Sequence, residues 1–142
     1  MKELSHRNRS STVVTDGRYV YKTQPKYLTD NEFYALLTML DSGYVPRASQ
    51  IGLETIRILF LAATPITDVS MFMSFCQPLL DAMKKRGLRH GDLTSYSVIP
   101  VLNRPMIIDW AESRMLDDPR PDKRPEGDAF WLRRTMESLC TS

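Results

Sequence analysis

The sequence predicts an α+β fold in which a small antiparallel sheet with one helix is followed by a mostly helical half. Two observations predict it. An Asp-Gly pair lies between two short runs of β-branched and aromatic residues, and later segments repeat apolar residues at helical spacing. The chain has 142 residues, 42% of them apolar and 25% charged, which is enough for one compact domain with a core.

The N-terminal segment predicts a tail followed by a hairpin. Residues 1–11 are polar and have little apolar content to anchor them, so we expect a flexible tail. Residues 12–15 and 18–22 flank Asp16-Gly17, a pair that tolerates the positive φ angles of a tight turn. The chain is therefore expected to open with two antiparallel strands.

A helix and two further strands are expected next. Thr29, with Glu32 three positions later, offers a capping box for a helix over about 30–41, in which apolar residues recur at helical spacing. Residues 51–53 and 55–61 have the apolar and β-branched composition of strands. The first half thus predicts the order β-β-α-β-β.

The second half predicts a helix and a short hairpin. Thr67 is the expected cap of a helix that ends at Gly87 and that Pro78 could bend. Residues 98–102 and 106–110 are expected to pair as two strands.

The C-terminal segment predicts a loop and a last helix. Residues 111–127 are almost all polar or proline, which is typical of a long loop. Residues 128–139 contain apolar residues to bury and a basic pair to expose, so we expect a final helix there.

Ionisable residues occur at the ends of these expected elements. Lys22 ends the second strand and Glu32 lies just inside the next helix, whereas His90 and Asp92 belong to the run His-Gly-Asp-Leu after the second helix. Asp109 ends an apolar strand in the run Ile-Ile-Asp-Trp. Two carboxylates presented by a loop and a neighbouring hairpin are suited to binding a divalent cation and to accepting a hydroxyl proton.

This order of residues resembles the protein-kinase-like phosphotransferase superfamily, and most closely its compact members, the aminoglycoside and choline phosphotransferases and the RIO-type kinases. The resemblance extends over about 13–139. It implies one kinase-like domain over 1–142 with two lobes, an N-lobe over about 12–64 and a truncated, mostly helical C-lobe over about 65–142.

The resemblance implies a role for each ionisable residue. Lys22 would hold the phosphates of ATP and be positioned by Glu32, and Asp92 would orient and deprotonate the attacking hydroxyl. Asp109 would bind Mg²⁺. The implied function is an ATP-dependent phosphotransferase that moves the γ-phosphate of MgATP to a hydroxyl, with a protein Ser or Thr as the expected acceptor.

The resemblance also implies a hinge and two structural residues. Backbone groups of the segment that begins with Leu61, Ala62 and Ala63 would hydrogen-bond the adenine ring. His90 would brace the catalytic loop, and Asp128 would hold the backbone of that loop from below.

Three departures from the family pattern leave a second function open. Ser97 stands where the family places a metal-binding Asn, five residues after Asp92, and a hydroxyl is the poorer ligand for Mg²⁺. The hairpin over 13–22 contains one glycine, Gly17, in place of a glycine-rich cradle. Few residues follow Asp109 to bind an acceptor. The alternative is a pseudokinase that acts as a nucleotide-binding or protein-interaction module.

Each candidate residue also has a purely structural interpretation. Lys22 could be a solvated lysine at a strand end, and Glu32 could close the capping box with Thr29. Asp92 after glycine could be ordinary turn chemistry, and Asp109 could cap a strand end.

Composition restricts the partners. A net charge of +2, and basic residues without interleaved aromatic residues, argue against nucleic acid as a partner. The apolar run 58–63 is too short for a membrane span, and Cys76 and Cys140 lack metal-binding spacing. We therefore expect a cytoplasmic protein that binds ATP and a protein substrate or regulatory partner, with a homo-oligomer left open.

Overall fold

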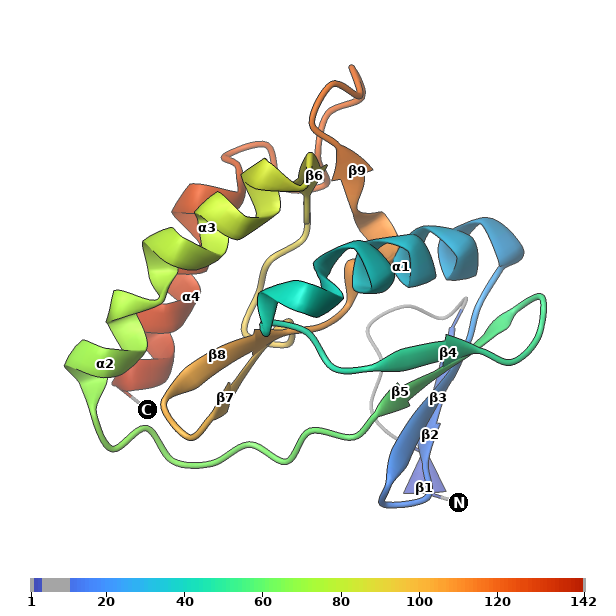
Figure 1. The fold of residues 1–142 in the computed structure, drawn as a ribbon, viewed down its shortest axis with the longest axis horizontal. Helices are drawn as coiled ribbons and strands as arrows, with labels where there is room; N and C mark the ends of the chain where they lie inside the picture. The colour runs from blue at the N-terminus through green and yellow to red at the C-terminus, as the bar shows by residue number, and fades with distance from the viewer. Residues whose placement is uncertain (1, 4–10, 142) are drawn as a thin grey trace.

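The computed structural model describes residues 2–3 and 11–141 (Figure 1). The first part of the chain contains β1 (Lys2–Glu3), β2 (Thr12–Thr15), β3 (Tyr19–Thr23), α1 (Lys26–Met39), β4 (Ala48–Gln50) and β5 (Thr55–Leu59). The second part contains α2 (Val69–Ser74), α3 (Cys76–Lys85), β6 (Leu88–Arg89), β7 (Val98–Val101), β8 (Arg104–Ile107), β9 (Arg114–Met115) and α4 (Asp128–Cys140). The α+β class expected from the sequence is confirmed.

The first part is a five-stranded antiparallel sheet in the order β1-β2-β3-β5-β4, with α1 beside it (Figure 1). The Asp16-Gly17 hairpin is confirmed. The Asp16 carboxylate accepts hydrogen bonds from the backbone N–H groups of Arg18 and Tyr19 at 2.9 and 2.8 Å, and Gly17 adopts a φ of +90°.

The expected flexible tail is wrong for the residues that can be judged. Lys2–Glu3 forms β1, which pairs with β2, and Ser11 is buried. Residues 1 and 4–10, on which most of that expectation falls, lie outside the described residues.

The helix α1 begins earlier than expected, at Lys26 directly after Pro25. The ring of proline fixes φ at a value compatible with a helix start, here −51°. Thr29 therefore lies inside the helix, and its hydroxyl donates a hydrogen bond to the Gln24 carbonyl at 3.2 Å. The capping box proposed for Thr29 and Glu32 is wrong.

The strand expected over 51–53 is also wrong. These residues form the turn between β4 and β5, and the side chains of Ile51 and Leu53 are exposed. The Gln50 side chain donates a hydrogen bond to the Gly52 carbonyl at 3.2 Å, which is a contact within a turn. Apolar composition alone was therefore a misleading strand signal here.

The single helix expected after Thr67 is two helices. Asp68, not Thr67, is the cap, because its carboxylate accepts a hydrogen bond from the Met71 N–H at 2.9 Å. The break lies at Phe75, between α2 and α3. Pro78 lies in the first turn of α3, where its missing N–H group leaves no hydrogen bond to the preceding turn, so α3 starts as a separate helix.

The remaining expected elements are confirmed with shifted ends. The helix α3 ends before Gly87, whose φ is +73°. The second hairpin is shorter than expected, since β7 and β8 turn through two residues with positive φ, Leu102 and Asn103. Within the expected loop over 111–127, β9 pairs with β6. No helix in the described part of the chain is long and apolar enough to cross a membrane.

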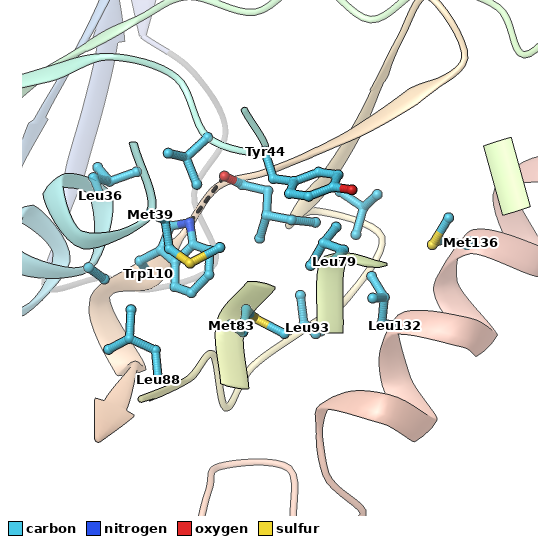
Figure 2. Close-up of a cluster of buried hydrophobic side chains, with 14 of the residues drawn as sticks. Leu36, Met39, Tyr44, Leu79, Met83, Leu88, Leu93, Trp110, Leu132 and Met136 are labelled. Carbon is cyan, nitrogen blue, oxygen red and sulfur yellow. Dashed lines mark hydrogen bonds between the residues drawn. The ribbon is translucent and has the colours of Figure 1, made fainter. Parts of the chain in front are cut away.

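A continuous apolar core joins the two parts of the chain. Met39 of α1, Leu79 of α3, Trp110 and Leu132 of α4 are all fully buried in this core (Figure 2). Because the core is shared, the sheet with α1 and the C-terminal helices hold each other in place.

Polar contacts also attach α1 to the second part, one set from the N-terminal half of the helix and another from the segment that follows it. The Asn31 amide donates hydrogen bonds to the carbonyls of Ala111 and Ser113 at 2.6 Å each. Beyond the other end of the helix, the Arg104 guanidinium stacks 4.3 Å from the centre of the Tyr44 ring and donates to the Gly43 carbonyl at 3.0 Å.

Replacing Leu79 by alanine should lower the free energy of unfolding by about 2–5 kcal/mol, because the cavity lies in the shared core. Urea unfolding followed by circular dichroism measures the change. Leu53→Ala is the matched control, since its side chain is 71% exposed, and it should change the free energy of unfolding by less than about 0.5 kcal/mol. A large loss in the Leu53 variant would contradict the turn described here.

Candidate active site

Lys22 and Glu32 form a buried ion pair between β3 and α1. The Lys22 Nζ lies 2.9 Å from the Glu32 Oε1, and the side chains are 11% and 1% exposed. Glu32 also accepts hydrogen bonds from the Gln24 amide at 2.9 Å and from the Trp110 N–H at 3.1 Å. Both oxygens of this carboxylate are therefore bound, and its place beside Lys22 excludes the capping interpretation.

Asp109 lies beside the same lysine. Its Oδ1 is 3.5 Å from the Lys22 Nζ, and its side chain is 31% exposed. It follows β8 by two residues instead of ending the strand, as the sequence had suggested, and its backbone adopts the left-handed conformation with φ 61° and ψ 55°. A non-glycine residue in this region costs on the order of 1 kcal/mol, which marks the position as one that the surrounding structure enforces.

The charge of Lys22 is maintained by its two partners. Burial alone lowers the pKa of the Lys22 ammonium, but the Glu32 and Asp109 carboxylates outweigh that effect, so its pKa lies above the ordinary value of 10.5. The site therefore presents a fixed positive charge next to a partly exposed carboxylate.

His90 braces the loop that carries Asp92, as the resemblance implied. Its Nδ1 accepts a hydrogen bond from the Asp92 N–H at 3.2 Å, so the Nε2 carries the proton and donates to the Ile108 carbonyl at 2.9 Å. The ring also packs against Trp110, with ring centres 4.7 Å apart. His90 is fully buried, and both of its ring nitrogens are engaged in these two hydrogen bonds.

Asp128, the first residue of α4, holds the same loop from the other side. Its carboxylate accepts hydrogen bonds from the N–H groups of His90 at 2.7 Å and Gly91 at 2.9 Å. Gly91 has a φ of +84°, a conformation that favours glycine. The structural role expected of Asp128 thus has a direct geometric basis.

Asp92 is buried and faces two basic side chains. The Arg124 Nε lies 3.0 Å from its Oδ1, and the Lys123 Nζ lies 3.9 Å from its Oδ2. Sequence reasoning missed both residues, because they lie in a polar, proline-containing segment with no periodicity. Only the folded chain brings them to Asp92.

Ser97 connects the Asp92 loop to the segment before Asp109. Its hydroxyl donates a hydrogen bond to the Asp92 carbonyl at 3.1 Å, and its own carbonyl accepts the Ile108 N–H at 2.9 Å. Ile108 therefore binds the loop through both of its peptide groups, the N–H to Ser97 and the carbonyl to His90. Asp92 and Asp109 are thus carried by two segments that hydrogen bonds hold side by side.

The expected hinge is an extended segment from β5 to α2 (Figure 1). Thr64 fixes its middle, with its N–H donating to the Pro100 carbonyl at 2.9 Å. Within the described residues, the backbone groups of Leu61, Ala62 and Ala63 form no hydrogen bond with other parts of the protein.

Candidate metal ligands are few. Among residues 2–3 and 11–141, no group of three or more His, Cys, Asp or Glu side chains gathers in a way that could hold a metal ion. Asp109 is the carboxylate beside Lys22 that remains partly exposed. A hard cation there would take most of its ligands from a bound molecule or from water, as Mg²⁺ commonly does.

Replacing Lys22 by methionine should lower the free energy of unfolding by about 3–5 kcal/mol near neutral pH, because Glu32 stays buried without its cation. Because the pKa of Lys22 is raised in the folded protein, the stabilisation by its ion pairs is fully present below pH 10.5. It is lost as the pH rises through the pKa of Lys22 in the folded state. Urea unfolding from neutral pH to above pH 10.5 measures both effects. The loss of stability at high pH should be weaker in the variant than in the wild type.

Lys26→Met is the control for this experiment, because Lys26 forms an exposed pair with Asp30. Exposed pairs contribute about 0–1 kcal/mol, so this variant should unfold almost like the wild type. Equal losses in the free energy of unfolding for the two variants would contradict a buried ion pair between Lys22 and Glu32.

Structural comparison identifies the fold. No protein-family model matches the sequence, and no curated protein matches it in sequence. Solved structures do match. The Rio2 kinase from Chaetomium thermophilum superposes with a TM-score of 0.65 at 17% identity over 98% of this chain and 55% of the kinase. The kinase PK-1 of Cydia pomonella granulovirus superposes with a TM-score of 0.64 at 16% identity over 84% of this chain and 55% of the kinase.

WbdD superposes with a TM-score of 0.59 at 13% identity over 99% of this chain and 46% of its own length. The chain spans about half the length of these proteins. The order of elements and the sheet topology described above are therefore those of a compact, two-lobed protein-kinase-like fold.

Proposed function

We propose that this protein is an ATP-dependent phosphotransferase that moves the γ-phosphate of MgATP to a hydroxyl group. One observation carries the proposal: Lys22, Glu32 and Asp109 meet at one place, beside a loop that holds a buried Asp92. Phosphoryl transfer needs mainly positioning and neutralisation of charge, and this arrangement offers a fixed cation and two carboxylates. Two of the proteins with a similar fold, Rio2 and PK-1, are kinases, which supports the same class.

Lys22 would bind the phosphate oxygens of ATP. Its ammonium is already oriented by Glu32, so little ordering is required when the nucleotide arrives. Asp109 would hold Mg²⁺, assisted by the Ser97 hydroxyl if that side chain turns from the Asp92 carbonyl. When bound, the metal would neutralise charge on the phosphates. A Rio2 structure that contains ADP and Mg²⁺ is consistent with this pairing of ligands.

Asp92 would act on the acceptor. In the transfer, the hydroxyl oxygen forms a bond to the γ-phosphorus, the bond from that phosphorus to the bridging oxygen of ADP breaks, and the hydroxyl proton passes to the Asp92 carboxylate. Leu61, Ala62 and Ala63 would bind the adenine ring through their peptide groups.

A protein Ser or Thr is the proposed acceptor of the phosphoryl group. We also propose a cytoplasmic location for the protein.

Ser97 favours a second function, that of a pseudokinase. Its hydroxyl is engaged with the Asp92 carbonyl, so metal binding there would compete with a contact that orders the loop. In this alternative, the protein binds a nucleotide or a partner protein without catalysing transfer.

Incubation with γ-labelled ATP and Mg²⁺ should label the protein or an added protein acceptor. Asp92→Asn should reduce labelling by about 10²–10⁴-fold, because the proton acceptor is lost, while the circular dichroism spectrum stays unchanged. Treatment with hydroxylamine distinguishes a hydroxyl ester, which survives, from a phosphoaspartate of the kind present in one Rio2 structure. No labelling by a folded wild-type protein would instead support the pseudokinase.

Saturating MgATP should raise the melting temperature, because a ligand at 100 times its Kd stabilises the native state by about 2.7 kcal/mol. Asp109→Ala should remove most of this shift, since it deletes the proposed metal ligand. Asp81→Ala, on the exposed face of α3, is the matched control and should keep the full shift. A shift that survives in the Asp109 variant would show that the nucleotide binds elsewhere.

A further inference from the structure

The segment 117–127, here called the strap, lies against the Asp92 loop on its way from β9 to α4. Arg89 donates a hydrogen bond to the Arg120 carbonyl at 3.0 Å, and its Nε lies 3.2 Å from the Asp122 Oδ1. The Arg124 N–H donates to the Gly91 carbonyl at 3.2 Å. Three prolines restrict the backbone of the strap further: Pro119, Pro121 and Pro125.

Gly91 allows this close approach. A Cβ atom at this position would lie 3.1 Å from the Glu112 carbonyl oxygen and 3.3 Å from the Asp122 Oδ1, in addition to the strain of a φ of +84°. A side chain would therefore push the strap away from the loop. The glycine before Asp92 thus serves both the turn of the loop and its contact with the strap.

Arg124 is fixed on several sides. Its Nε lies 3.0 Å from the Asp92 Oδ1, and its guanidinium lies 4.8 Å from the centre of the Trp131 ring. Pro125 follows it and favours an extended backbone at Arg124. The carboxylate of Asp92 is 4% exposed, so nearly all of its surroundings are set by the protein.

The loop itself supplies no basic side chain. Residues 92–97 read Asp-Leu-Thr-Ser-Tyr-Ser, without Lys or Arg. Phosphoryl transfer requires positive charge near the phosphoryl group and its acceptor. The strap places two cations beside Asp92, Arg124 against one oxygen of its carboxylate and Lys123 at 3.9 Å from the other.

We propose that Arg124 is a positioning residue for phosphoryl transfer, which acts by holding the Asp92 carboxylate in the orientation that meets the acceptor hydroxyl. The inference rests on the proposed function. A guanidinium that both donates to the carboxylate and stacks on an indole leaves the carboxylate little rotational freedom. The strap is then a working part of the site.

The test compares kcat and the KM for ATP in the full chain, with γ-labelled ATP and a protein acceptor. Arg124→Gln should lower kcat at least tenfold and leave the KM for ATP unchanged, because Lys22 and Asp109 are untouched. Arg124→Lys should recover part of kcat, since it restores the charge without the planar geometry. Trp131→Phe keeps an aromatic surface under Arg124 and should lower kcat only about threefold.

Arg120→Gln is the matched control. It removes the same charge from the same strap, but the Arg120 side chain pairs with Asp118 and does not contact Asp92. This variant should keep kcat within about twofold of the wild type, as surface substitutions usually do. All variants are assayed well below their melting temperatures, so that a lower kcat does not reflect a smaller fraction of folded protein.

The outcomes separate the inference from the function on which it rests. An active wild type with an equally active Arg124→Gln variant overturns the inference alone. A higher kcat in the Arg124→Gln variant also overturns the inference, because the wild-type strap would then block Asp92. Equal losses of kcat in the Arg120→Gln and Arg124→Gln variants overturn it as well. A folded wild-type protein that transfers no phosphate overturns the proposed function and the role of Arg124 with it.

Discussion

The buried carboxylate of Glu32 is the constraint on which the rest of the structure depends. An ionised side chain away from water is tolerated only when donors surround it, and three separate segments supply them here. Lys22 comes from the sheet, Gln24 from the chain before α1, and the Trp110 N–H from the segment after β8. This one group therefore fixes the helix against the sheet and brings the second part of the chain to both.

Local chemistry explains which elements could be predicted from the sequence. The Asp16-Gly17 turn and the helix end at Gly87 depend on backbone conformations that few residue types adopt, so their signals are specific. The start of α1 and the turn over 51–53 were misjudged because a plausible capping residue and apolar composition outweighed the weaker signals of Pro25 and Gly52. Such competition is decided by packing, which a single sequence does not display.

The residues of the candidate site also fall into those that the sequence could suggest and those that it could not. Lys22, Glu32, Asp92 and Asp109 could be proposed because their order along the chain resembles that of a known family, and the fold supports that order. The partners Gln24 and Arg124 could not, since their contacts span distant or irregular segments and leave no periodic pattern. Asp109 was expected to end a strand, whereas it follows β8 by two residues in a left-handed conformation that only the fold displays.

The attachment of α1 and of the segment after it has a dynamic consequence. Asn31 and the Arg104 contacts hold this helix and its continuation to the second part of the chain, so rotating the helix outward would break these hydrogen bonds together with the shared core. A helix anchored in this manner is poorly suited to serve as an on-off switch. Control over such a molecule would have to act through the availability of its ligands instead of through rearrangement of its interior.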